Sequence, residues 1–509
     1  MSLSEQPPSR AQIALLLFSI FIVALCGLTY ELLSGAVSSY LLGNSVLWFS
    51  LTIGGFMTAM GIGAWLSRTM KDALLERFIA VEVLVGMIGG LAGPLLFGAY
   101  TWTQGYVAAL FVFVGVIGIG VGLEIPLLTR YLEQYGGLRK TISDVMSVDY
   151  AGALGAALLF PLVLLPYLGL MKTFPAIGLL NLSVAAVTIF AFRRRLKNLW
   201  WLSGATAIGI ALMVGVMVVS EQWMSRVESS LYTDQILYAE QSSYQRIVMT
   251  RYKDDTRLFI DGHLQLSSRD EYRYHETLVH PAMTMSANRE RVLVLGGGDG
   301  MAVREILKYP DVKEVTLVDL DPVMTRLGTE HPALTELNQR SMHDPRVTVV
   351  NGDGYQFLEK SSDLWSVIII DFPDPHGEAL AKLYSVHFYG MVRRGLSPGG
   401  IAVTQSTSPY FAREAFWCIE KTVEIAQMNA LPYHVWVPSF GEWGFMLMSG
   451  TTLDVTRLNM SVETKWLDSS VIRGMFDFPS DMSRVEVDHN RLTDPVILQY
   501  YGSSWSKWF

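Results

Sequence analysis

Two acidic residues follow an aliphatic run in the segment 368–377, which reads IIIDFPDPHG. Asp371 comes directly after the run, and Asp374 follows between Pro373 and Pro375. Carboxylates are costly to bury and are rarely buried without partners. The pattern therefore predicts one of two structures: a surface turn with solvated acids, or a site that holds a cationic group.

A glycine-rich turn, LGGGDG (295–300), follows another aliphatic run. Gly296, Gly298 and Gly300 have the spacing G-x-G-x-G, and glycine permits a tight turn and a close approach of the backbone to a ligand. Asp299 stands inside this turn, where its charge would repel a phosphate and would suit a cationic ligand. The alternative for Asp299 is the N-cap of the helix that follows.

Short aliphatic segments alternate with helical patterns between residues 291 and 406, which predicts a doubly wound parallel sheet. Asp319 ends the second expected strand, where nucleotide-binding sheets place an acid on ribose hydroxyls. Asp353 and Gly354 end the third, where we expect the adenine. Because the carboxyl ends of parallel strands share one edge, these residues predict an adenosine-type site beside Asp371 and Asp374. The expected strands are residues 291–298, 314–321, 346–354, 365–371 and 399–406, and a helix is expected over 302–309.

The composition narrows the class of protein. Half of the 509 residues are hydrophobic and only 17% are charged, and the mean hydropathy of +0.31 is typical of a protein with membrane spans. The net charge of −8 argues against a nucleic-acid binder, which usually has a basic face. Two cysteines, Cys26 and Cys418, are too few for a disulfide framework or a metal cluster.

Long apolar runs fill the first part of the chain. Each is long enough to cross a hydrocarbon core of about 30 Å. The first run is too long for a signal peptide and lacks a small-residue cleavage site. Acids within or at the edges of the runs are candidates for a cation path, or lie at the headgroup level: Glu31, Glu82, Glu124 and Asp149. We count seven runs: 12–33, 45–67, 75–99, 104–128, 148–168, 172–192 and 200–219.

Basic residues concentrate in the loops after the second, fourth and sixth runs. The positive-inside rule places these loops and the N-terminus in the cytoplasm, so seven spans would leave the rest of the chain outside. The residues are Arg68, Lys71, Arg77, Arg130, Arg139, Lys140, Arg193, Arg194, Arg195 and Lys197.

The character of the sequence changes near Met224, after which charges are regular and short alternating segments appear. The segments 245–252 and 256–267 look like strands joined by a polar turn. We expect a transmembrane domain of about seven helices in residues 1–223. Residues 224–288 would form a small β-subdomain, 289–455 the nucleoside-binding domain, and 456–509 a C-terminal extension to which we assign no function.

Residues 230–450 resemble the spermidine synthase (polyamine aminopropyltransferase) family nearly end to end. Six motifs occur in order: YQRIVM, DGHLQLSSRDEYRYHETLVHP, VLVLGGGDG, VTLVDLD, NGDGYQF and DFPDP. With its apolar first half, the chain is similar to the membrane-anchored bacterial branch. The resemblance implies a multi-span helical domain, a β-subdomain and a Rossmann-like, methyltransferase-type α/β domain.

The resemblance also implies the reaction and its residues. The aminopropyl group of decarboxylated S-adenosylmethionine moves onto a diamine, with putrescine giving spermidine and methylthioadenosine; the donor is a co-substrate, and neither a cofactor nor a metal is expected. An ammonium has no lone pair, so the attacking amine must lose a proton, and Asp371 matches the family's proton acceptor. The diamine side would comprise Asp374, Asp299, His275, Tyr274 and Gln265. The nucleoside side would comprise Gln245, Gly296, Gly298, Asp319, Asp353 and Gly354.

Two departures from the family pattern leave the acceptor open. Phe372 and Pro373 replace the small hydroxyl residues of the soluble enzymes, and Phe440 stands where many relatives carry a tyrosine. The alternatives are an S-adenosylmethionine-dependent methyltransferase on the same fold, and a membrane polyamine sensor or transporter whose synthase-like domain only binds.

The expected partners are small-molecule substrates and the lipid bilayer, without nucleic acid, and homo-oligomer formation stays open. The expected location is the cell (inner) membrane as a multi-pass protein. We expect the catalytic domain in the cytoplasm, where the donor is made, although the loop charges with seven spans predict the opposite.

Overall fold

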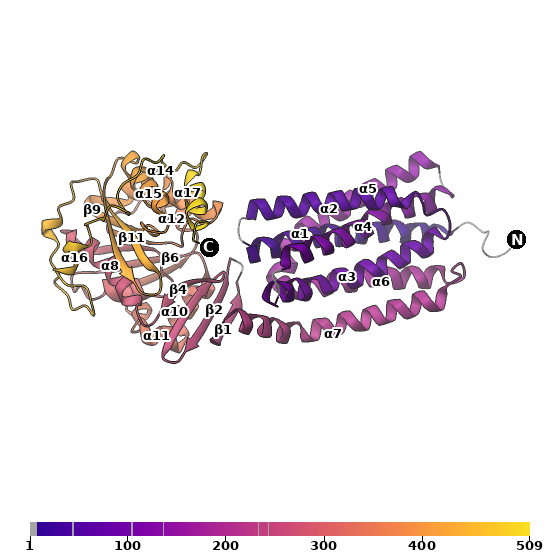
Figure 1. Ribbon diagram of the computed structural model, residues 1–509, viewed down its shortest axis with the longest axis horizontal. Coiled ribbons are helices and arrows are strands. Elements are labelled where there is room, and N and C mark those ends of the chain that lie inside the picture. Colours follow the sequence, from indigo (N-terminus) through magenta and orange to yellow (C-terminus); the bar gives the residue numbers. More distant parts are fainter. Residues whose placement is uncertain are drawn as a thin grey trace. The chain divides into compact units, whose positions relative to one another are not determined.

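The computed structural model describes residues 8–42, 45–102, 105–135, 137–232, 234–242 and 244–508. The chain divides between residues 233 and 234 into two compact units. We call residues before this point the helical unit and those after it the sheet unit (Figure 1).

The helical unit consists of long apolar helices. Helix α2 packs along α4, α3 packs against α4 and α6, and α1 packs against α5. The backbones approach closely where small residues face each other, as membrane helices do. A Cβ atom at Gly122 of α4 would lie 2.1 Å from the carbonyl oxygen of Met60 on α2. The helices are α1 (Arg10–Leu42), α2 (Ser45–Ser67), α3 (Leu74–Trp102), α4 (Tyr106–Glu133), α5 (Leu138–Leu159), the π-helix η1 (Phe160–Leu164), α6 (Leu165–Phe192) and α7 (Leu199–Leu231).

Within the described residues, six continuous helical segments are long and apolar enough to cross a membrane, whereas the sequence predicted seven. The difference lies in residues 138–192, which form one unbroken segment by this measure. At about 1.5 Å per residue that segment would be about 80 Å long, far more than a hydrocarbon core. Gly169, at φ 67° and ψ 176°, interrupts it. Gly169 therefore separates the fifth expected run, 148–168, from the sixth, 172–192, within this segment.

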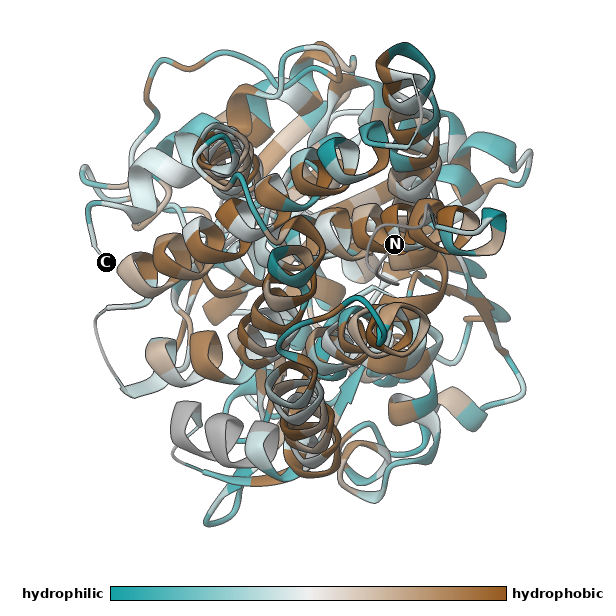
Figure 2. Ribbon diagram, turned by 90° about the vertical axis from the view of Figure 1, so that its right-hand side faces the viewer, coloured by the Kyte–Doolittle hydropathy of each residue, from teal (hydrophilic) through white to brown (hydrophobic). Residues whose placement is uncertain are grey.

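Large apolar side chains face outward from the helical unit. Phe18, Met57 and Tyr167 are 60%, 63% and 81% exposed. Figure 2 shows hydrophobic residues along most of the length of these helices. An apolar exterior of this extent matches a lipid environment better than water.

The basic loops lie at one end of the helical unit. The Arg130 guanidinium, near the end of α4, donates to the carbonyl oxygens of Ser67, the last residue of α2, and of Met70 in the loop that follows. Glu76, at the start of α3, accepts from the side chain of Asn198 between α6 and α7. The loops after α2, α4 and α6 thus meet, and α7 begins at this end and leads away from it.

The sheet unit begins with a four-stranded antiparallel sheet in the order β1-β2-β3-β4. A seven-stranded sheet follows, in the order β10-β11-β9-β8-β5-β6-β7. The five expected strands are present and run parallel, and the expected fold class is confirmed. The sequence did not predict β10 and β11, which join antiparallel at one edge. The strands are β1 (Gln235–Gln241), β2 (Arg246–Tyr252), β3 (Asp255–Ile260), β4 (His263–Ser267), β5 (Arg291–Gly296), β6 (Glu314–Asp319), β7 (Val347–Asn351), β8 (Trp365–Asp371), β9 (Leu396–Gln405), β10 (Asn429–Val437) and β11 (Gly441–Ser449).

Helices cover the larger sheet on both faces, which explains its continuous aliphatic strands. In β8, Val367 and Ile369 enter one apolar cluster, and Ile368 and Ile370 enter the other. The C-terminal segment belongs to this core, because Leu467 lies in the first cluster and Ile497 in the second. The helices are α8 (Glu271–Met285), α9 (Met301–Ile306), α10 (Pro322–Glu330), α11 (Pro332–Leu337), α12 (Gly354–Lys360), α13 (Glu378–Ala381), α14 (Val386–Gly395), α15 (Arg413–Ile425), α16 (Val471–Gly474) and α17 (Val496–Trp505).

Candidate active site

The predicted acids converge at the carboxyl edge of the seven-stranded sheet. Gly296, the last residue of β5, pairs in register with Asp371, the last residue of β8. On the other side of β5, Asp319 ends β6. The strand register therefore brings the glycine turn between these two acids.

Asp371 is held by a tyrosine from α8. The hydroxyl of Tyr274 donates to Asp371 Oδ1 over 2.7 Å. Withdrawal from water raises the pKa of Asp371 to about 6, with Asp299 adding to the rise and His275 and Tyr274 opposing it. A carboxylate with this pKa is largely ionised at neutral pH and still basic enough to accept a proton.

His275 is a buried cation rather than a base. Its Nδ1 lies 2.9 Å from Glu271 Oε2. Burial alone would lower the pKa of His275, but the hydrogen bond to Glu271 and the charges of Asp299, Glu271 and Asp371 outweigh burial and raise it to about 9. The Arg304 guanidinium fixes Glu271 through two hydrogen bonds of 2.9 Å. His275 is therefore charged at neutral pH and cannot take a proton from a substrate.

Asp374 is surrounded by polar groups from two segments, the end of β9 and α17. Thr407 Oγ1 donates to Asp374 Oδ2 over 2.9 Å, and Gln405 Nε2 lies 3.3 Å from Oδ1. The Tyr501 hydroxyl, on α17, approaches this carboxyl and acts on its pKa. Burial raises the pKa of Asp374 to about 6, and these donors limit the rise. The C-terminal extension thus supplies a residue to the site.

The loop that joins the two acids is fixed by its backbone. Gln405 Nε2 donates to the carbonyl oxygen of Phe372 over 2.6 Å, and the Tyr384 hydroxyl donates to that of Pro373 over 2.9 Å. Gln405 Nε2 also lies 2.7 Å from the Tyr384 hydroxyl. Because both carbonyls are bonded and Pro373 is rigid, the spacing of the acids is set by the fold.

Asp319 is built into the glycine turn. Its Oδ2 accepts from the backbone N–H of Gly298 and its Oδ1 from that of Asp321, both over 2.9 Å. A Cβ at Gly298 would lie 2.7 Å from Asp319 Oδ2, so only glycine permits this approach. Burial raises the pKa of Asp319 to about 6 although the two N–H groups oppose the shift. Gly296 has φ +83°, and a Cβ there would lie 2.1 Å from the carbonyl oxygen of Asp371.

Asp299 is not the N-cap of α9, because Gly300 takes that position. Asp299 lies one residue earlier, and its Oδ1 accepts from the backbone N–H of Met301 over 2.9 Å. Its charge also acts on His275 and Asp371. Asp299 therefore lies beside the acid cluster, and contact with a cationic ligand stays a prediction.

Asp353 and Gly354 lie at the start of α12. Asp353 Oδ1 caps the helix by accepting from the backbone N–H of Tyr355 over 2.8 Å, and Oδ2 lies 2.9 Å from Lys382 Nζ. A Cβ at Gly354 would lie 3.1 Å from the Phe372 ring. The Asp353 carboxylate is thus already bonded to protein donors on both oxygens.

The two predicted glutamines, Gln245 and Gln265, belong to the four-stranded sheet and its turns. Gln245 is half-buried in the turn before β2, and its backbone is bonded to Ser242, whose hydroxyl donates to Asp321 Oδ2 over 2.6 Å. Gln265 lies on β4, with Nε2 3.4 Å from the carbonyl oxygen of His263. This turn therefore contacts the loop that follows Asp319.

Several residues of the site were not predicted from the sequence. Gln405 and Thr407 stand at the end of the fifth expected strand, so the strand-end argument applied to Asp371 could have found them. Tyr501 has no comparable signal, because it lies on a short helix 130 residues after Asp371. The others are Glu271, Arg304 and Tyr384.

The comparisons with known proteins cover both units. The spermine/spermidine synthase domain model matches residues 271–459. A crystal structure of spermidine synthase in complex with the transition state analogue AdoDATO aligns with 48% of this chain and 86% of its own, at 25% identity and a TM-score of 0.44.

Three relatives match along nearly their whole lengths. Polyamine aminopropyltransferase 1 of Ralstonia nicotianae is 47% identical, covering 99% of this chain and 97% of its own. The polyamine aminopropyltransferases of Leptospira interrogans and Mycobacterium tuberculosis are 43% and 36% identical, each covering 97% of this chain and 99% and 96% of their own. These identities extend over the helical unit as well as the acid cluster at the sheet edge, and the chain belongs to the polyamine aminopropyltransferase (spermidine synthase) family.

Proposed function

We propose that this transferase moves the aminopropyl group of decarboxylated S-adenosylmethionine onto putrescine, giving spermidine and methylthioadenosine. The observation that carries the proposal is the state of Asp371, an acid at a strand end with a pKa of about 6 and a hydroxyl donor at 2.7 Å. A proton acceptor of this strength is what an amine nucleophile needs at neutral pH.

The donor would occupy the edge of the sheet around β5 and β6. Asp319 would accept the ribose hydroxyls, and the turn at Gly296 and Gly298 would let the backbone approach the nucleoside. Gln245 would approach from the four-stranded sheet, and Asp353 with Gly354 from the start of α12. Because Asp353 is paired with Lys382, we expect it to act by shaping the pocket as much as by direct contact.

The diamine would lie beyond the glycine turn, among the acids. Asp374 would hold the distant ammonium, with Asp299, Tyr274, His275 and Gln265 along the channel. The nearer ammonium gives one proton to Asp371, and its freed electron pair attacks the propyl carbon bonded to the sulfonium. The C–S bond breaks, its electrons stay on sulfur, and neutral methylthioadenosine leaves. Holding these atoms in line supplies much of the remaining acceleration.

We also propose that the helical unit spans a membrane and that the sheet unit lies in the cytoplasm. Supply of the donor supports the second statement, whereas the basic loops at the start of α7 favour the opposite side. Reporter fusions to the C-terminus, with matched fusions to the loop after α6, decide between them. A C-terminal fusion active only outside the cytoplasm would contradict the proposed sidedness.

Incubation of the purified full-length protein with labelled decarboxylated donor and a panel of diamines tests the reaction. We expect a product heavier by one aminopropyl group, formed fastest from putrescine among diamines of three to five carbons. Transfer of a methyl group from S-adenosylmethionine, or binding of amines without any transfer, would contradict the proposal. Preference for another diamine would keep the reaction and change only the acceptor, a change that Phe440 beside Tyr274 could produce.

A further inference from the structure

Two glutamates face each other inside the helical unit. Glu82 on α3 is 0% exposed and Glu124 on α4 is 1% exposed. No N–H or O–H group of any other described residue donates to either carboxyl. The two carboxyl groups lie within hydrogen-bonding reach of each other. Buried acids normally have a cationic or hydrogen-bonding partner, so this pair calls for an explanation.

Glu82 and Glu124 lie too far from the helix ends to be at the level of the lipid headgroups. Glu82 follows the first residue of α3 by eight positions, about 12 Å along the axis, and Glu124 precedes the last residue of α4 by nine, about 14 Å. A helix of 29 residues is about 44 Å long and exceeds a hydrocarbon core of about 30 Å by roughly 7 Å at each end. Both acids therefore lie within the apolar part of the helices.

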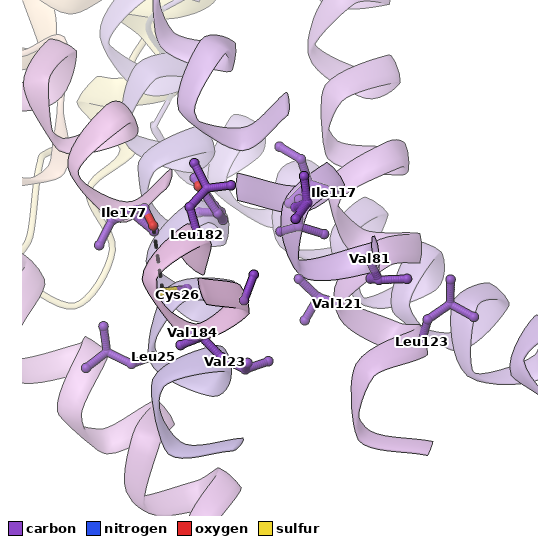
Figure 3. Packing of buried hydrophobic residues seen from close by; sticks show 14 of the residues in the cluster. Val23, Leu25, Cys26, Val81, Ile117, Val121, Leu123, Ile177, Leu182 and Val184 are labelled. Carbon is purple, nitrogen blue, oxygen red and sulfur yellow. Dashed lines mark hydrogen bonds between the residues drawn. The ribbon is translucent and has the colours of Figure 1, made fainter. Parts of the chain in front are cut away.

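A third polar group joins the pair from α1. The Tyr30 hydroxyl is fully buried, has no hydrogen-bond partner among the described residues, and interacts electrostatically with both glutamates. Buried apolar residues neighbour the glutamates in the sequence, among them Val81, Val83 and Leu123. Figure 3 shows Val81 of α3 and Val121 of α4 among the buried apolar side chains of the helical unit, and Cys26 of α1 pointing at the carbonyl oxygen of Ile177, 3.9 Å away.

The three groups carry no positive charge, and their own donors are limited to the Tyr30 hydroxyl and any proton on the carboxyl groups. Two adjacent carboxyls in an apolar core cannot both be ionised alone, so the pair shares at least one proton. A primary ammonium brings one positive charge and three N–H donors, enough for both carboxylates and the Tyr30 oxygen. Intramembrane acids that face the bundle interior commonly mark such cation sites.

We propose that Glu82, Glu124 and Tyr30 form a binding site for primary ammonium groups, in which a bound amine replaces the proton that the two glutamates otherwise share. The exchange conserves charge: two carboxyls with one proton carry −1, and two carboxylates with one ammonium also carry −1. The released proton goes to water. This site is separate from aminopropyl transfer, and it would let the helical unit bind the cationic amines that the family uses.

Infrared difference spectroscopy of the full-length protein in lipid nanodiscs tests the exchange. At neutral pH we expect a protonated-carboxyl band in the wild type that is lost in the double variant Glu82→Gln/Glu124→Gln. Spermidine or putrescine should remove this band and release one proton per amine bound. Sodium chloride and tetramethylammonium, which carry charge without N–H donors, should leave the band in place.

Other outcomes would overturn the proposal. A band that saturating amine does not change would make the pair a structural element only. A band removed equally by sodium would make the site one for simple cations. Repeating the titration in an Asp371→Asn background separates the result from catalysis, because the response of the glutamates should persist there.

The Tyr30→Phe variant covers the case in which the double variant fails to fold. It keeps the ring and both acids, and loss of one hydrogen bond should weaken the amine response by about 2–10-fold. Tyr106→Phe is the matched control, since the hydroxyl of this other buried tyrosine donates to Ser38. Equal amine affinity in Tyr30→Phe and Tyr106→Phe would contradict the assignment of the Tyr30 hydroxyl to the site.

Discussion

Each unit of this protein holds a pair of acids, and the two pairs differ in what surrounds them. In the sheet unit, Asp371 receives a hydrogen bond from Tyr274, and Asp374 receives them from Thr407 and Gln405. In the helical unit, Glu82 and Glu124 receive none from the described residues. Similar groups are therefore placed in opposite settings within one chain.

The difference shows what decides the chemistry of an acid. Donors near both aspartates, and the His275 cation near Asp371, keep the two acids largely ionised at neutral pH, so they can accept a proton or hold an ammonium. Without donors, the glutamates must share a proton until a cation arrives. Removing the donors or the acids one at a time should therefore change the activity or the substrate affinity of the sheet unit in measurable ways.

Asp371→Asn should have the largest effect. The substitution keeps the size of the side chain and an oxygen for the Tyr274 hydrogen bond, but it removes the proton acceptor. We expect kcat to fall by about 10²–10⁴-fold while both substrates still bind. Steady-state kinetics and separate binding titrations measure the two effects.

Asp344→Asn is a matched control. Asp344 precedes β7, at the opposite edge of the sheet, and pairs with Arg346. Its variant should keep normal kcat. A near-normal kcat in Asp371→Asn would show that Asp371 is not the proton acceptor and has only a structural role in the turn.

The pH dependence of kcat/KM should report the titration of both Asp371 and Asp374. Each has a pKa of about 6 and acts as a carboxylate, so activity is present above that pH and is lost as pH falls through it. If both must be ionised, kcat/KM for the diamine at saturating donor, where Asp319 is already occupied, should drop about 100-fold between pH 7 and pH 5. Asp374→Asn should halve the steepness of this acid limb on a logarithmic scale. Full recovery on return to pH 7 excludes unfolding, and a single-step limb in the wild type would contradict a role for two acids.

Asp319→Ala should weaken donor binding by about 10–100-fold, the cost of losing charge-assisted hydrogen bonds. The diamine KM should change little, because Asp319 lies beyond the glycine turn from Asp374. Asp319→Asn removes the charge but keeps one carbonyl oxygen, which can accept from the N–H of either Gly298 or Asp321 but not from both, so it should disturb the turn less than Asp319→Ala does. A fall in diamine affinity alone would place the two substrates the other way round.

Sequence patterns predicted the parallel sheet because its five buried strands are continuous aliphatic runs, such as 365–371. They predicted that Asp319 and Asp371 meet because strand ends converge at one edge, whatever the length of chain between them. The strands β10 and β11 escaped prediction, since polar residues such as His434 and Glu442, which pair with each other, interrupt their apolar pattern.

Tyr501 escaped for a different reason. It reaches Asp374 only because residues after 455 fold back over the sheet, and contacts of that range leave no local pattern. The protonation state of His275 also could not be predicted from the sequence. Its charge depends on Glu271, one helical turn earlier, and Glu271 is held by Arg304 from a different helix.

Tyr501→Phe should raise the diamine KM by about 2–10-fold with little change in kcat, since it removes the hydroxyl that approaches Asp374, the group proposed to hold the ammonium. Tyr500→Phe is the matched control on the same helix, because the Tyr500 hydroxyl accepts from the backbone of Asp488 and not from the site. Equal KM values in the two variants would show that the C-terminal extension only packs against the sheet.

Among these changes, separating the two units should have the smallest effect, measured as the affinity of the sheet unit for methylthioadenosine. The three apolar clusters of the sheet unit contain no residue before Leu237, and all six family motifs lie after residue 243. A fragment of residues 234–509 should therefore fold and bind methylthioadenosine within about twofold of the full chain, by calorimetry. The same fragment with Asp319→Ala should bind weakly, which ties the signal to the site. A folded fragment that does not bind would mean that the helical unit helps to form the nucleoside site, and the two acid pairs would then belong to one cooperative system.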